Sequence, residues 1–105
     1  MNKTITISIG RAVGTTPMNT RTWRNFIRLV NNLVADTVNP DSLWVHNAKS
    51  NNDWQGNPEE TRTWVFDTDF SKIEQIDVAL KILTIDFKQD AIARTSGETR
   101  LVGIE

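Results

Sequence analysis

Positions 4–9 read TITISI, an unbroken alternation of hydroxyl-bearing and β-branched apolar side chains. A period of two is typical of a half-buried β-strand, because successive side chains of a strand point to opposite faces. We therefore predict a strand in which Ile5, Ile7 and Ile9 face a core and the residues between them face away. The two glycines and Pro17 that follow at positions 10–17 indicate a connection.

Two amphipathic segments predict helices that pack on the sheet. Asn19 is a suitable N-cap for a helix that runs to about Asp36 and carries Trp23 on its apolar face. Residues 71–74, Ser-Lys-Ile-Glu, fit a capping box and predict the start of a second helix, which ends near Gln89-Asp90. The core face of this second helix is expected to consist of Ile73, Ile76, Leu80, Leu83 and Phe87.

The remaining apolar segments predict three more strands. These are residues 43–46, residues 60–67, and a last strand over 91–94 and 99–102 that is broken at Ser96-Gly97, while the polar residues 47–58 are expected to form a hairpin connection with a long tip. The element order is thus strand, helix, strand, strand, helix, strand. It predicts one α+β domain over residues 1–105, a ferredoxin-like βαββαβ fold with a four-stranded antiparallel sheet and two helices on one face. The pattern leaves open which face of the hairpin strands meets the helices.

The composition excludes several classes of protein. The 105 residues are 38% hydrophobic and 24% charged with a net charge of −1, values typical of a soluble domain. The absence of cysteine excludes a disulfide scaffold, a thiolate zinc site and a cysteine nucleophile. Apolar runs are far shorter than the roughly 20 residues that span a bilayer, and the N-terminus lacks an apolar signal-peptide core. We therefore expect a cytoplasmic protein with no membrane partner.

Charge is distributed unevenly along the chain. Residues 1–50 carry six basic and two acidic side chains, whereas residues 51–105 carry six basic and eleven acidic ones. Such a chain either presents faces of opposite sign, which can orient a partner, or simply has an uneven solvated surface. Arg21, Arg24 and Arg28 lie on the polar face of the first predicted helix, where they could contact phosphates. Because the total charge is slightly acidic and no strand carries an RNA-stacking aromatic pattern, we do not expect nucleic acid as a partner.

No known catalytic or metal-binding motif is present. The chain lacks the glycine-rich phosphate and dinucleotide loops, the G-x-S-x-G elbow and the H-E-x-x-H zinc motif. His46 is the only histidine, and it is either a general base or, more simply, a strand residue with ordinary hydrogen bonds. We therefore expect no metal, no cofactor and no enzymatic activity.

Two features suggest surfaces for a partner. Val78, Ile82 and Ile85 form a second apolar stripe on the second helix, opposite its core face, and either the C-terminal segment or another protein covers it. If the stripe is a self-association or partner surface, Ile82→Arg weakens an assembly and leaves the fold intact. Trp54 lies in a polar loop and is either an exposed anchor or part of a lid folded back onto the sheet.

Several short motifs resemble a group of small proteins of phages and bacterial mobile elements for which no activity is established. The similarity lies at 7–11 (ISIGR), at Pro17-Met18 with Trp23 and Phe26, at 54–60 (WQGNPEE) and at 87–93 (FKQDAIA). This chain has Thr61 where the group usually has serine, and Lys88 where glycine is more typical. The resemblance implies a βαββαβ fold and an origin in a phage or mobile element, and it assigns no catalytic residue.

Together these observations favour two functions. The first is a small accessory protein that binds and inhibits or redirects a host protein, for example an anti-CRISPR-type inhibitor. Its partner-binding residues would be Trp54, Glu59, Glu60, Val78, Ile82 and Ile85, with a homodimer as a further use of the apolar stripe. The alternative is a dimeric α+β barrel that binds a small molecule and is capable of cofactor-free catalysis. Its pocket would be lined by Trp44, His46, Arg62 and Trp64, with His46 as the candidate base.

Overall fold

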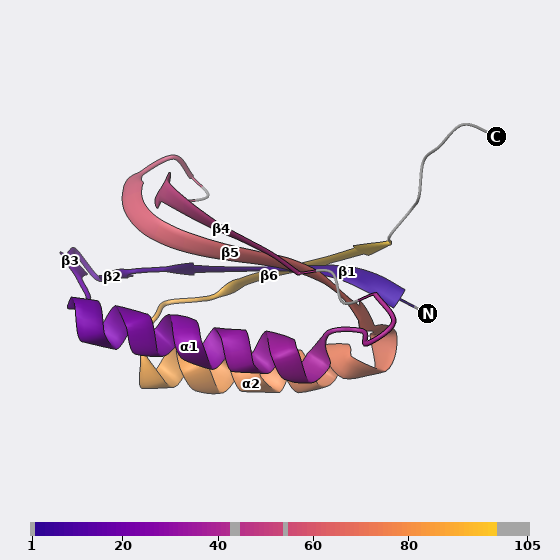
Figure 1. Ribbon diagram of the computed structural model, residues 1–105. Helices are drawn as coiled ribbons and strands as arrows, with labels where there is room; N and C mark the ends of the chain where they lie inside the picture. Colours follow the sequence, from indigo (N-terminus) through magenta and orange to yellow (C-terminus); the bar gives the residue numbers. More distant parts are fainter. Residues whose placement is uncertain (1, 43–44, 54, 99–105) are drawn as a thin grey trace.

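The protein, described by a computed structural model over residues 2–42, 45–53 and 55–98, has two layers: one sheet, and two helices on one of its faces (Figure 1). The sheet has four antiparallel strands in the order β4-β5-β1-β6. This is a ferredoxin-like type of α+β fold, so the predicted fold class is confirmed. In chain order the elements are β1 (Asn2–Gly10), β2 (Ala12–Val13), β3 (Thr16–Pro17), α1 (Thr20–Thr37), β4 (Val45–Asn52), β5 (Pro58–Asp69), the 3-10 helix η1 (Phe70–Lys72), α2 (Ile73–Asp86) and β6 (Ala93–Glu98).

The centre of the sheet is the pair β1 and β5. Ile5 and Ile7 are 0% exposed and Ile9 is 2% exposed, which confirms that this side of β1 faces the core. In the register of the two strands Ile5 lies opposite Phe66 and Ile7 opposite Trp64, and both aromatic side chains are also buried. The even-numbered residues of β5 therefore face the helices, a choice that the sequence left open.

Helix α1 begins as its sequence predicts. The Asn19 side chain accepts a hydrogen bond from the backbone N–H of Thr22 at 2.8 Å, as an N-cap does. The apolar face of the helix, which includes Trp23 and Phe26, is buried against the sheet. The Phe26 ring stacks on Phe87 with 4.3 Å between the ring centroids, and this contact joins α1 to the end of α2.

The start and end of α2 differ from the prediction. Strand β5 continues to Asp69, whose carboxylate accepts a hydrogen bond from the backbone N–H of Ser71 at 2.9 Å and caps η1. Ser71 therefore lies inside a turn, and the predicted Ser71–Glu74 capping box is wrong. The helix ends at Asp86 instead of near Gln89-Asp90. The predicted core face is confirmed, since Ile76, Leu80, Leu83 and Phe87 are buried and Ile73 packs against the same core.

The hairpin is longer and its tip shorter than predicted. Polar residues 47–52 continue β4 because they pair with β5, with Ala48 opposite Thr63 and Ser50 opposite Thr61. The tip is a turn organised by Asp53, whose carboxylate accepts hydrogen bonds from the backbone of Gln55 and Asn57. Near its start β5 bends away from the helices (Figure 1). Backbone pairing outweighs the low strand propensity of the asparagines here.

The last described strand, β6, also differs from its prediction. It passes through Ser96 and Gly97 without a break, and Gly97 pairs with Thr4 of β1. The predicted continuation over 99–102 lies outside the described residues, as do Trp44 and Trp54. Within the described part of the chain, neither helix has the length and apolar character needed to cross a membrane.

Candidate functional site

A groove of ≈590 Å³ lies at one end of the outer face, the sheet face turned away from the helices. Odd-numbered residues of β5 and even-numbered residues of β1 point to this face, because their neighbours point to the core. The floor is consequently made of small or hydroxyl-bearing residues, and the Ser8 and Thr63 hydroxyls are hydrogen-bonded at 2.9 Å. The floor consists of Ser8, Gly10, Thr61 and Thr63, with Ser50 beside them on β4.

Glu59 supplies a carboxylate that is packed tightly against the backbone of β1. Its Oε1 accepts a hydrogen bond from the backbone N–H of Ala12 at 2.9 Å. A Cβ placed on Gly10 would lie only 2.1 Å from the same oxygen, far inside van der Waals contact. Glycine at position 10 is therefore needed for the close approach of this carboxylate, and not for an unusual φ. The arrangement gives the groove one fixed acidic group.

Glu60, the next residue, belongs to a different cluster. One of its oxygens accepts a hydrogen bond from Arg11 at 2.7 Å, and the other lies 3.6 Å from the ammonium group of Lys49. The hydrogen bond from Arg11 is the main cause that lowers the pKa of Glu60. Burial opposes it to a lesser extent, and the positive charge of Lys49 lowers the pKa by a smaller amount again. Arg11 also donates to the backbone carbonyl of Met18 at 2.7 Å. Glu60 thus fixes the β2–β3 hairpin and is not a free surface carboxylate.

The opposite wall of the groove is the loop from α2 to β6. Its backbone turns at Lys88, which has a φ of +54°, and the N–H of Gln89 donates to the carbonyl of Thr84 at 2.9 Å. The Gln89 side-chain amide donates to the carbonyl of Ala12 at 3.3 Å. This bond links the loop to the same residue that holds Glu59, so both walls share one support.

The charged residues of the groove are mostly acidic. Its described lining contains three carboxylates, Asp53, Glu59 and Asp90, and a single cationic side chain, Lys88. No group of three or more metal-ligating side chains is found in the residues that the structure describes. A groove of this size with an excess of carboxylates, hydroxyl groups and an amide suits a small polar ligand that carries positive charge.

The pocket predicted from Trp44, His46, Arg62 and Trp64 is not assembled. Trp64 is 1% exposed in the core, and its indole N–H donates to the Asn31 side chain at 2.7 Å. Arg62 points to the same helix-covered side, with its Nε buried, whereas His46 pairs with Val65 and lies on the outer face. Because residues on opposite faces of a sheet cannot line one cavity, His46 does not meet Arg62 and Trp64. Trp44 lies outside the described residues.

The predicted partner surface is divided as well. Glu59 and Glu60 point to opposite faces of the sheet, and Trp54 lies outside the described residues. The apolar stripe on α2 is exposed, with Val78 at 56%, Ile82 at 53% and Ile85 at 70%. Among the described residues β6 does not cover it, so self-association through this stripe stays a prediction.

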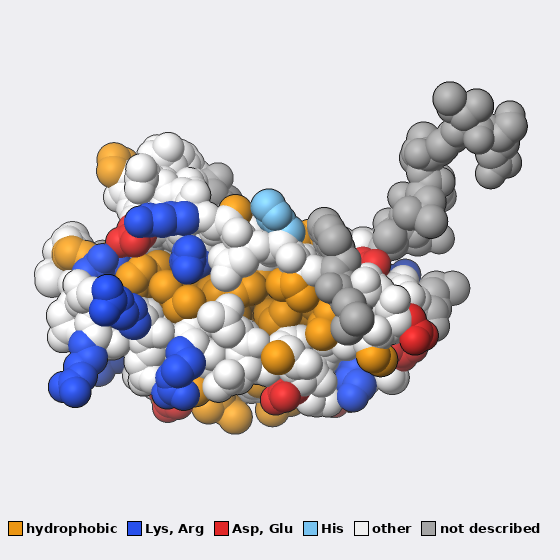
Figure 2. Space-filling view, viewed as in Figure 1, with side chains coloured by type: hydrophobic (Ala, Val, Ile, Leu, Met, Phe, Trp, Pro, Cys, Tyr) orange, Lys and Arg blue, Asp and Glu red, His pale blue; other side chains and the backbone are white. Residues whose placement is uncertain are grey.

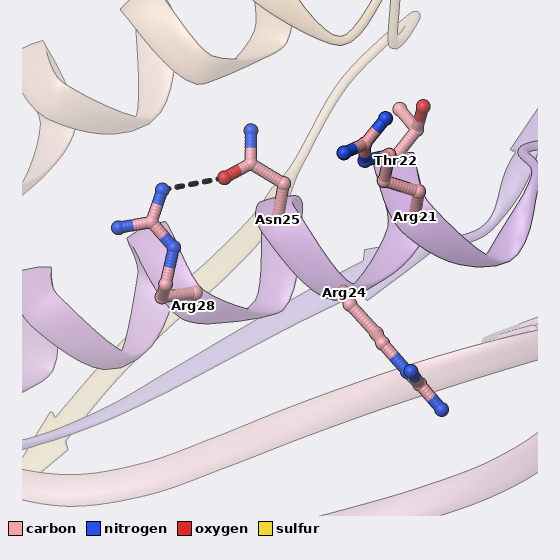
Figure 3. A pocket seen from close by; sticks show the side chains of 5 residues that line it. All are labelled: Arg21, Thr22, Arg24, Asn25 and Arg28. Atoms are coloured by element: carbon pink, nitrogen blue, oxygen red, sulfur yellow. Dashed lines mark hydrogen bonds between the residues drawn. The ribbon is translucent and has the colours of Figure 1, made fainter.

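A second, shallower hollow of ≈460 Å³ lies on the exposed face of α1 and is lined by Arg21, Thr22, Arg24, Asn25 and Arg28. Lys and Arg side chains gather over the N-terminal half of α1 (Figure 2). Arg28 donates to Asn25 at 2.6 Å, and Arg24 points away from Arg21 and Arg28 (Figure 3). Arg24 is thus directed to another side of the helix than Arg21 and Arg28, and the three side chains do not converge on one point (Figure 3). That nucleic acid is not a partner remains a prediction.

Sequence reasoning missed most of the groove. Gly10, Lys88 and Gln89 belong to no catalytic motif, and Gly10 lies far in the sequence from the other two. One usable signal was the strand parity of 4–9, which places Gly10 on the outer face at the end of β1. A glycine at the end of an otherwise perfect alternation indicates the close approach of another group.

Comparisons with known proteins give one informative result. No protein-family model and no curated protein matches the chain. Among solved structures, a phage SAM lyase in complex with S-methyl-5'-thioadenosine has a similar fold, with 17% sequence identity and a TM-score of 0.54. The match covers 92% of this chain and 81% of the lyase chain. At this identity the similarity shows the fold.

This finding contradicts two predictions made from the sequence. One was an inhibitor or adaptor of a host protein, of anti-CRISPR type, and the other was the absence of enzymatic activity. The fold is shared with an enzyme that has a nucleoside bound, and this agrees better with the small-molecule alternative. The prediction that the protein has no enzymatic activity rested on the absence of a local catalytic motif. Here the polar groups of the groove come from residues that are distant in sequence and meet only through strand pairing.

Proposed function

We propose that this chain is a small enzyme that binds SAM (S-adenosylmethionine), or a closely related sulfonium nucleoside, in the outer groove and cleaves a carbon–sulfur bond. The observation that carries this proposal is the acidic groove, found on a fold shared with a SAM lyase. A fold alone does not define a function, so the argument depends on whether the groove suits such a substrate.

The charge of the groove supports a sulfonium ligand. A sulfonium ion has a full positive charge and no N–H or O–H to donate, so a protein attracts it by placing carboxylates nearby. The Glu59 carboxylate accepts a hydrogen bond from Ala12 and lies against Gly10, so it is held at the end of β1 beside the hydroxyl floor. The Thr61 hydroxyl donates to the Asn52 carbonyl, and the Ser8 and Thr63 hydroxyls are bonded to each other, so together they offer acceptors and one remaining donor to a ribose or a base. The volume of ≈590 Å³ is in the range of small-molecule sites.

The proposed reaction needs no second reactant. The bond between sulfur and the four-carbon amino-acid chain breaks, and sulfur keeps the electron pair and becomes a neutral thioether. As this bond breaks, the same carbon gains a C–O bond from the substrate's own carboxylate and a lactone forms, or the neighbouring carbon loses a proton to the Glu59 carboxylate and an alkene forms. Both routes balance without water, metal or redox cofactor. The Glu59 carboxylate would attract the positive sulfur of the substrate and so contribute to its binding.

The direct test is incubation of the purified chain with SAM, followed by mass spectrometry for S-methyl-5'-thioadenosine and NMR of the four-carbon product. We expect release of the thioether above the spontaneous rate, and a loss of about 100-fold or more in kcat/KM for Glu59→Gln. Glu74→Gln, an exposed α2 residue with the same change of charge, is the matched control. Turnover that is absent in the wild type, or equal in wild type and Glu59→Gln, contradicts the proposal.

The setting of the protein is part of the same proposal. A phage protein with this fold and the resemblance at 7–11 and 54–60 both favour an origin in a phage or mobile element. SAM is made and used in the cytoplasm, so the enzyme is expected to act there. A homodimer formed through the outer face would enclose the groove, as the barrel hypothesis predicts, and light scattering of the purified chain tests it.

A further inference from the structure

The loop opposite Glu59 has an unusual residue at its turn. Lys88 follows the last turn of α2 and adopts a φ of +54°, in the left-handed region. Its backbone N–H donates to the Ile85 carbonyl at 3.2 Å, so it lies in the turn directly after the C-cap residue Phe87. Glycine is the residue best suited to such a position, because a side chain destabilises the left-handed conformation. The position therefore keeps a side chain that the backbone does not favour.

The lysine side chain has no structural partner that explains its presence. Lys88 is exposed, and within the described part of the chain its ammonium group makes no ion pair or side-chain hydrogen bond. It lines the groove, where it is the only cationic side chain in the described lining and lies on the wall opposite Glu59. A lysine that only ended the helix would not need to line the groove.

We propose that Lys88 forms the subsite for the carboxylate of the substrate's amino-acid part, an inference that rests on the proposed function above. A sulfonium amino acid has a positive sulfur and a negative carboxylate at the two ends of a short chain. The groove matches this pair, with a fixed carboxylate on one wall and a lysine on the other. The substrate is thereby oriented with its adenosine over the hydroxyl floor and its carboxylate at the α2–β6 loop. Lys88 is a positioning and specificity residue and takes no part in bond cleavage.

The test compares two ligands that differ only in the carboxylate: SAM and decarboxylated SAM. Their dissociation constants are measured by calorimetry for the wild type, Lys88→Gly, Lys88→Asn and Lys88→Arg. Glycine and asparagine both tolerate the left-handed conformation, so these variants remove the charge without straining the loop. Lys81→Gln, on the exposed side of α2, is the control for a change of net charge far from the groove.

We expect Lys88→Gly and Lys88→Asn to weaken SAM binding about five- to tenfold, the effect of losing an exposed charged pair. Binding of decarboxylated SAM is expected to stay within about twofold, and Lys88→Arg is expected to restore SAM binding. Lys88→Gly should also melt at a higher temperature than the wild type, which a lysine kept for structural reasons would not do. Equal losses for both ligands, or no loss for SAM, overturn the carboxylate subsite and leave the proposed function standing. If the wild type binds neither ligand, the proposed function itself is wrong.

Discussion

The two faces of the sheet are made of the same strands but differ in composition: one is apolar and buried under the helices, and the other is mostly polar. The helix-covered face of β1 and β5 consists of Ile5, Ile7, Trp64 and Phe66, all at most 1% exposed and packed against each other. On the outer face the same two strands present mostly polar side chains, among them Ser8, Thr61 and Thr63. Glu59 and Glu60 show the contrast most clearly, since one enters the groove and the other locks Arg11. Alternate residues of one strand can thus build the core and line the groove separately.

The largest expected difference is in stability between the two faces. Ile7→Ala removes a fully buried side chain from the centre of the core and is expected to cost about 2–5 kcal/mol of unfolding free energy. Thr6→Ala, one residue earlier on the outer face, is expected to cost about 1 kcal/mol or less. Urea denaturation of both variants measures the contrast. Similar losses at the two positions would mean that the outer face is also part of a packed core.

The next effect tests the contact that shapes the groove. Gly10→Ala places a methyl group where the Glu59 carboxylate lies, and this flexible group is expected to move aside, at a cost of about 1–2 kcal/mol through its lost hydrogen bond to Ala12 and with weaker binding of the proposed substrate SAM. In a Glu59→Ala background the same substitution should cost less than about 0.5 kcal/mol, because the clashing group is gone. Chemical denaturation of the four proteins in this cycle gives the coupling. Additive effects would show that Gly10 serves another purpose.

The smallest effect concerns the other glutamate. Because Arg11 lowers the pKa of Glu60, this group contributes stability at every pH above its unfolded pKa, near the ordinary value of 4.5. That contribution decreases as the pH falls from there through the lower folded pKa, where Glu60 becomes protonated. Glu60→Gln is expected to cost about 1 kcal/mol at pH 7 and almost nothing at pH 2. Denaturation across this range checks the sign, and a deficit that persists in acid would contradict it.

Local pattern was sufficient for most of the fold. The alternation at 4–9, the Asn19 cap and the apolar face of α2 each predicted an element that the structure confirms. It was insufficient where pairing with a neighbour outweighed propensity, as in residues 47–52 of β4. The Ser71 capping box failed for a related reason, because β5 extends to Asp69 and this residue caps first.

The candidate site could not be predicted from local sequence patterns. Glu59 was singled out, but together with Glu60 and Trp54 as part of a protein-binding surface. His46, Arg62 and Trp64 were expected to share a pocket, but His46 lies on the opposite face of the sheet from the other two. Lys88 was named only as part of a family resemblance, and Gln89 only there and at the predicted end of the second helix. None of these assignments follows from spacing, because the groove joins the end of β1, the start of β5 and the loop after α2.

What the sequence determined by itself is the order of the main helices and strands and the core faces of β1, α1 and α2, since hydrophobic periodicity and capping act between residues close in the chain. What only the tertiary structure decided is which strand face meets the helices, and hence which polar residues come together. That choice depends on the register of β5 against β1, in which Thr61 lies opposite Gly10 and brings the preceding Glu59 over the end of β1. A shift of the register by one residue would move every side chain of β5 to the other face and remove the groove.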